Sequence, residues 1–174
     1  MTKQEIISQL LTNYQEFTEF IDNLSDEEFV YSNGAKWTAG QQLEHLCRAV
    51  KPLTQGFILP KFAFSLFFGK AERESLNYDE LVKKYQTVLA AGGKASGKFI
   101  PKTIKLSEKE RLKAQLLKSV ESLTKRLEKF SENELDKYLL PHPLLGKLTI
   151  REMLYFTIYH AMHHHQGTLK NLEK

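Results

Sequence analysis

A repeated helix-start signal constrains the fold of this chain more than any other feature. At six possible helix starts, a Ser or Thr is followed three residues later by Glu or Gln, the arrangement called a capping box. Its two side chains bind backbone N–H groups that the first helical turn leaves unpaired. Because nearly all of these boxes precede an apolar pattern of helical period, they predict an all-α chain. The boxes are Thr2/Glu5, Ser25/Glu28, Thr38/Gln41, Ser107/Glu110, Ser131/Glu134 and Thr149/Glu152.

Four of the boxes open long segments in which apolar residues recur every three or four positions, as an amphipathic helix requires. These segments cover about Lys3–Asn23, Thr38–Gln55, Glu108–Phe130 and Ile150–Leu172. Short links join the first segment to the second and the third to the fourth. About fifty residues separate the second from the third, so we expect a four-helix bundle with a long crossover between helices 2 and 3.

The most apolar part of this crossover is Phe57–Gly69. It is shorter than the roughly 20 residues that a membrane-spanning helix needs, and it contains Pro60 and Lys61. We expect a buried or partner-facing helix here, with shallow membrane contact as the alternative. Apolar area left exposed on it would favour a homodimer. A further helix over Asn77–Ala91 and a flexible loop over Gly92–Lys98 are expected to follow.

Composition narrows the class of protein. The 174 residues suit one domain over 1–174, with a net charge of +4. Between Lys83 and Lys125 acidic residues alternate with the lysines, which is typical of a solvated surface, so we expect no nucleic acid as a partner. Cys47 is the only cysteine, and the N-terminus lacks the apolar stretch of a secretory signal. Both features favour a reducing, cytoplasmic location.

Histidines cluster near the end of the chain. Of six in total, four lie within six residues: His160, His163, His164 and His165. On a helix, His160 and His164 lie one turn apart on the inward side, whereas His163 points toward solvent. His165 falls on the opposite flank, either as a partner of the ligands or as a surface residue. Two histidines at this spacing are a known way to present two imidazoles to one metal ion.

A third ligand from another helix would complete such a site, and the candidate is His45, seven residues into the second long segment. Three neutral imidazoles suit zinc or nickel and leave a position for water or substrate. Such a metal ion activates a bound hydroxide or thiolate at neutral pH. The alternative for each histidine is a hydrogen-bonded core residue, because a buried imidazole without a metal ion needs polar partners.

Three segments, taken in order, carry a family resemblance: Trp37–Leu46 (WTAGQQLEHL), Pro141–Thr149 (PHPLLGKLT) and His160–Gly167 (HAMHHHQG). The last is similar to an H-x-x-H-H-x-x-Q pattern, although Gln166 comes at a slightly shorter spacing. Over essentially its whole length the chain resembles the DinB-like (DinB/YfiT-like) metalloenzymes. The resemblance implies a four-helix bundle with a three-histidine metal site.

That resemblance carries over onto His45, His160 and His164 as metal ligands and assigns no further catalytic residue. Relatives include thiol transferases that use low-molecular-weight thiols such as bacillithiol. We therefore expect a divalent-metal-dependent enzyme acting on a small-molecule substrate, either a thiol S-transferase or a hydrolase. The alternatives are a non-catalytic metal-binding or stress-response bundle, and an interaction module that uses Phe57–Gly69.

Three other residues have two interpretations each. Trp37 precedes the Thr38 cap, where it suits packing onto helix 2, and the alternative is a place at the mouth of the site. His142 lies between two prolines in a loop, and an approach to the rim of the site is the less favoured of its interpretations. Cys47 points well away from His45 on a helix, so a structural thiol is favoured over a ligand.

Overall fold

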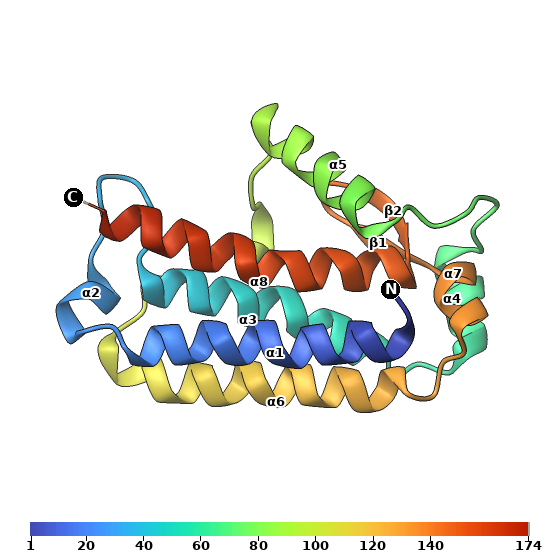
Figure 1. Ribbon diagram of the computed structural model, residues 1–174, viewed down its shortest axis with the longest axis horizontal. Helices are drawn as coiled ribbons and strands as arrows, with labels where there is room; N and C mark the ends of the chain where they lie inside the picture. The colour runs from blue at the N-terminus through green and yellow to red at the C-terminus, as the bar shows by residue number, and fades with distance from the viewer. Residues whose placement is uncertain (174) are drawn as a thin grey trace.

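The computed structural model describes residues 1–173 and is mainly helical (Figure 1). In chain order its elements are α1 (Lys3–Asp22), α2 (Asp26–Val30), α3 (Ala39–Gly56), α4 (Lys61–Phe68), α5 (Tyr78–Ala90), the 3-10 turns η1 (Gly97–Phe99) and η2 (Leu106–Glu108), α6 (Lys109–Leu127), α7 (Glu132–Lys137), the strands β1 (Leu139–His142) and β2 (Gly146–Thr149), and α8 (Ile150–Leu172).

The helix starts follow the capping pattern closely. Five of the six predicted boxes form, each with both of its hydrogen bonds. The prediction at Ser107/Glu110 is wrong, because Ser107 lies inside the η2 turn and α6 begins only at Lys109, without a side-chain cap. A backbone already wound into a 3-10 turn cannot adopt the extended conformation of an N-cap residue. Asn77 caps α5 through an equivalent box with Glu80.

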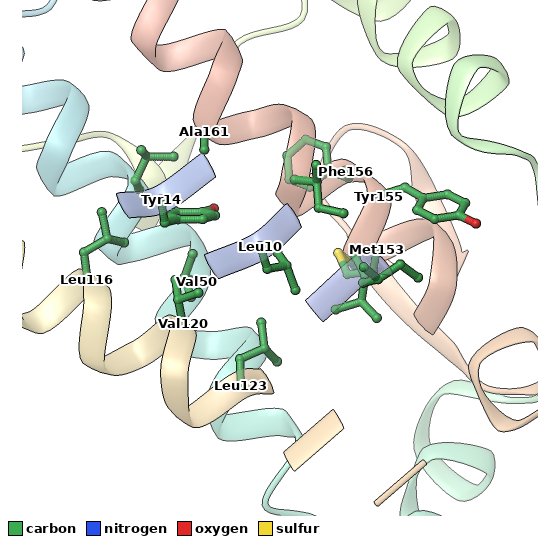
Figure 2. Packing of buried hydrophobic residues seen from close by; sticks show 14 of the residues in the cluster. Leu10, Tyr14, Val50, Leu116, Val120, Leu123, Met153, Tyr155, Phe156 and Ala161 are labelled. Atoms are coloured by element: carbon green, nitrogen blue, oxygen red, sulfur yellow. The ribbon is translucent and has the colours of Figure 1, made fainter. Parts of the chain in front are cut away.

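The four long helices pack against one another around one apolar cluster. α1 contacts α6 and α8, and α3 contacts the same two helices. Figure 2 shows part of the cluster, with side chains of α1 lying between those of α6 and α8. Full burial of each large aliphatic or aromatic side chain stabilises the fold by about 1.5–3 kcal/mol. The largest fully buried side chains of this apolar cluster include Tyr14, Phe17, Leu43, Leu46, Leu116 and Leu123.

A small hairpin corrects the expectation of a purely helical chain. β1 and β2 pair antiparallel just before α8, with Leu140 opposite Leu148 and His142 opposite Gly146. Gly146 has φ +75°, which the tight turn requires and which other residues rarely adopt. Because each strand has only four residues and β1 contains Pro141, the alternation of buried and exposed residues is too short to signal a strand.

The crossover contains two helices, as expected. α5 packs against α8, while α4 packs against β1 at one end of the molecule (Figure 1). Within residues 1–173 no helix combines the length and the apolar character needed to cross a membrane.

Glu152 connects the crossover to α8. Its fully buried carboxylate accepts hydrogen bonds of 2.8 Å from Arg73 Nη2, the Leu76 amide and the Thr149 amide. Burial raises the pKa of this carboxyl group, but the Arg73 guanidinium and the two amides outweigh that effect and hold the pKa below its ordinary value. A depressed pKa means that the ionised form stabilises the folded state.

We predict that Glu152→Gln lowers the free energy of unfolding at pH 7 by about 1.5–3 kcal/mol, the range for hydrogen bonds to a charged group. The wild-type advantage is present above the ordinary Glu pKa of about 4.3 and is lost as pH falls through the lower folded pKa. Urea unfolding between pH 7 and pH 3 measures both effects. Exposed Glu121→Gln is the control, and equal losses in the two variants would contradict the assignment.

Candidate metal centre

The three predicted ligands meet at one point between two helices. His45 comes from the middle of α3, and His160 and His164 come from successive turns of α8. All three side chains are buried. His160 Nε2 lies 3.2 Å from His45 Nε2 and 2.9 Å from His164 Nε2. The ring nitrogens are therefore close enough together to share one ion.

Hydrogen bonds fix the state of two of these rings. His45 Nδ1 lies 2.7 Å from the carbonyl oxygen of Phe99, and because a carbonyl only accepts, Nδ1 carries the proton. His164 Nδ1 donates in the same way to Gln42 Oε1. In the neutral rings both Nε2 atoms are then bare lone pairs directed at His160. Partners of this kind orient the ligands in known metal sites.

This arrangement of lone pairs fits a metal ion. His160 Nε2 can donate at most one proton, so at least one of its two close N···N contacts would place lone pair against lone pair. A cation between the nitrogens removes that repulsion. Zn–N bonds of about 2.0–2.1 Å at tetrahedral angles separate neighbouring ligands by about 3.3 Å. The 3.2 Å spacing between His160 and His45 lies close to this value, and the 2.9 Å spacing between His160 and His164 is somewhat shorter.

The surroundings keep the ligands neutral. Burial lowers the pKa of His45, and this outweighs the opposing effect of its bond to Phe99. Burial, followed by the neighbouring imidazoles, holds the pKa values of His160 and His164 well below the ordinary range. A neutral imidazole is the form that binds a metal ion, so the site is prepared for one at neutral pH.

Aromatic rings cover the ligands. The centre of the Trp37 indole lies 5.0 Å from the centre of the His45 ring and 6.1 Å from that of the His164 ring. The indole is nearly parallel to the His164 ring. Phe156 packs 4.6 Å from His160. Trp37 is half-buried, and these ring distances place it against the histidines. This position agrees with the second of its two interpretations from the sequence. These rings restrict ligand rotation and keep water away from much of the site.

A segment of the crossover is held over α3 beside the site. Arg48 Nη1 donates to the carbonyl of Lys98 at 2.8 Å, and the Lys102 amide donates to Glu44 at 2.7 Å. Glu44 also pairs with Arg48. Together with the bond from His45 to Phe99, these contacts anchor the end of the loop that was expected to be flexible. Glu44 is engaged here and does not face the ligand nitrogens.

The other C-terminal histidines do not join the cluster. His163 is half-buried, with its ring 5.7 Å from that of Tyr85, rather than pointing freely into solvent. His165 packs 4.2 Å from Phe20 on α1. Of the four histidines in six residues, the structure therefore places His160 and His164 in the cluster, as helical spacing predicted, and leaves the other two packed against aromatic rings.

His142 belongs to the hairpin and not to the ligand set. Its Nδ1 accepts hydrogen bonds from the amides of Leu144 and Leu145, which stabilises the turn. Burial, and after it the charge of Lys84, lowers the pKa of His142 to about 4. Phe156 contacts both His142 and His160, so the hairpin histidine lies one aromatic ring away from the metal ligands.

Cys47 also lies outside the cluster. Its thiol donates to the carbonyl of Leu112 on α6 at 3.4 Å. Burial raises the pKa of this thiol to about 12, so it stays protonated and unreactive at neutral pH. Its position agrees with a structural role.

Two groups that hydrogen-bond the clustered histidines were not predicted from the sequence. Gln42 stands three residues before His45, and this spacing places both side chains on the same side of α3. That signal was available. The Phe99 carbonyl is a backbone group from a distant loop, and no residue pattern reveals which carbonyl meets His45.

Comparison with known proteins agrees with this geometry. The family model described as the DinB superfamily matches residues 9–166. The chain belongs to the DinB superfamily. The matched range includes all three histidines of the cluster, and DinB proteins commonly bind a metal ion. No curated protein matches the chain.

Gln42 provides a test of how this DinB protein orients its ligands. Gln42→Ala removes the acceptor for His164 Nδ1, and we expect metal affinity to fall about 10- to 100-fold without loss of the fold. Competition with a chromophoric chelator measures the affinity for zinc and for nickel. Exposed Gln55→Ala on the same helix is the matched control. Unchanged affinity in the Gln42 variant would show that this bond does not support the site.

Proposed function

We propose that residues 1–174 form a single DinB-like domain whose long helices make a four-helix bundle around a catalytic divalent metal ion, zinc or nickel. The ligands in this proposal are His45, His160 and His164. One observation carries it: three neutral ring nitrogens converge at ligand spacing with too few protons to satisfy one another. Three neutral ligands leave the ion its full double charge, which suits an anionic fourth partner.

The reaction we propose is transfer of a small thiol onto an electrophilic carbon of a second small molecule. The sulfur–carbon bond forms, the bond from carbon to the leaving group breaks, and the thiol proton passes to solvent. When bound, the ion supplies a position where sulfur is held as the thiolate at neutral pH. The chain supplies orientation, through Gln42 and the Phe99 carbonyl, and shielding from water, through Trp37 and Phe156.

Hydrolysis is the second candidate reaction, and the same ligand set favours it. Three neutral imidazoles and one free position also suit an activated water molecule. The two candidates differ in their nucleophile, so they are separable by the substrate that is consumed. A purely structural ion predicts a third pattern, in which chelation destabilises the link between α3 and α8 and no substrate turns over.

Metal content tests the ligand assignment. In untagged protein we expect close to one equivalent of zinc or nickel per chain, and almost none in a His160→Ala, His164→Ala variant. His163→Ala is the matched control, because it removes a half-buried imidazole from the same helix that contributes no ring nitrogen to the cluster. Elemental analysis, with circular dichroism to verify folding, makes the measurement. Equal metal content in all three proteins would refute the site.

Turnover tests the reaction. We expect conjugation of monobromobimane to at least one low-molecular-weight thiol at a rate that falls to background after chelation and returns when zinc or nickel is added. The His163→Ala control should keep the wild-type rate. A panel of esters under the same conditions tests hydrolysis. If the protein binds metal yet accelerates neither reaction, the catalytic proposal fails and the structural ion remains.

A further inference from the structure

One surface of the protein is far more apolar than a solvated face requires. Helix α4 and the turn before it expose five large apolar side chains, which we call the α4 face. Phe62, Leu66 and Phe67 are exposed to 69%, 72% and 65% of their area. Contiguous apolar patches of this kind on soluble proteins mark contacts with other molecules. The full set is Ile58, Leu59, Phe62, Leu66 and Phe67.

The inner side of the helix fixes how this face is presented. Phe64 is fully buried and packs with its ring 5.8 Å from those of both Phe57 and Phe130, and 5.9 Å from that of Tyr138. Ala63 is buried beside it. The anchored helix therefore holds its outer side chains in a defined arrangement, as a preformed binding surface requires.

Charge around the helix argues against a strongly anionic partner. The Lys61 ammonium lies 2.7 Å from a Glu134 carboxylate oxygen and 5.1 Å from the centre of the Phe130 ring. Lys147 Nζ donates to the carbonyl of Phe68 at the end of the helix. The ammonium groups of Lys61 and Lys147 already have partners within the chain. What α4 offers is apolar area rather than free positive charge.

We propose that the α4 face binds the same face of a second copy of this chain, related by a two-fold axis. A two-fold contact pairs one patch with itself, so it needs no surface beyond the one described. Taking about 180 Å² for each fully exposed large side chain, the five exposed fractions cover roughly 550 Å² per chain. A symmetric pair then buries roughly 1,100 Å², just above the roughly 1,000 Å² that a specific interface needs.

This dimer is separate from the metal centre. The ligands lie on α3 and α8, whereas α4 packs against β1, beside α7 at one end of the molecule (Figure 1). Metal binding and self-association are therefore expected to vary independently. Because the area is near the lower limit for a stable interface, association should depend on concentration, with a dissociation constant on the order of micromolar.

Sedimentation velocity over about 1–100 µM protein tests the proposal. We expect wild-type protein to pass from monomer to dimer in this range. In Phe62→Glu, Leu66→Glu the face carries charge at its centre, and we expect at least a tenfold weaker association with unchanged circular dichroism and metal content. The matched control is Leu11→Glu, Leu169→Glu, which replaces two exposed leucines elsewhere and should dimerise like the wild type.

Three outcomes would overturn the proposal. The first is wild-type protein that stays monomeric throughout the range, and the second is an α4 variant that dimerises as strongly as the control. The third outcome is binding to a lipid surface, which flotation with vesicles of phosphatidylcholine and phosphatidylserine distinguishes from dimerisation. A monomer that floats with these vesicles, and loses flotation in the α4 variant, would assign the face to a lipid surface instead of a second copy.

Discussion

Three imidazole nitrogens held within 4.8 Å of one another, inside the apolar core, are the constraint on which the rest of the structure depends. Neutral rings so placed repel through their lone pairs unless a proton or a cation lies between them. Burial disfavours protonation, since it lowers the pKa of each ring. A metal ion would remove this repulsion, and the DinB superfamily to which the chain belongs is commonly metal-binding.

The bundle serves this constraint by fixing three rings from two helices. Packing of α3 and α8 against the same neighbours, α1 and α6, determines the distance between His45 and the α8 pair. Gln42 and the Phe99 carbonyl then determine which nitrogen of His164 and of His45 faces the centre. The loop that supplies Phe99 is itself held by Arg48 and Glu44, on the same helix as His45. Ligand orientation and loop position are therefore coupled.

The molecule divides its polar and apolar features by location. The histidine cluster lies between α3 and α8, whereas five of the exposed large apolar side chains gather on the short α4 and the turn before it, at one end of the molecule. Phe64 packs beneath that face and anchors α4, so the exposed side chains are held in a fixed arrangement. Separation of this kind would let one chain carry the proposed metal site and the proposed dimer surface without either blocking the other.

Local chemistry determined much of this protein. Capping boxes such as Thr38/Gln41 and Thr149/Glu152 act within four residues, so the sequence predicted where the helices begin. Helical spacing likewise selected His160 and His164 over His163. Tertiary structure decided the rest: the meeting of His45 with that pair, the contact of Phe99 with His45, the β1–β2 hairpin and the exposure of α4. These features depend on packing between residues that are far apart in the sequence. Contacts of this kind leave no local pattern from which they could be predicted.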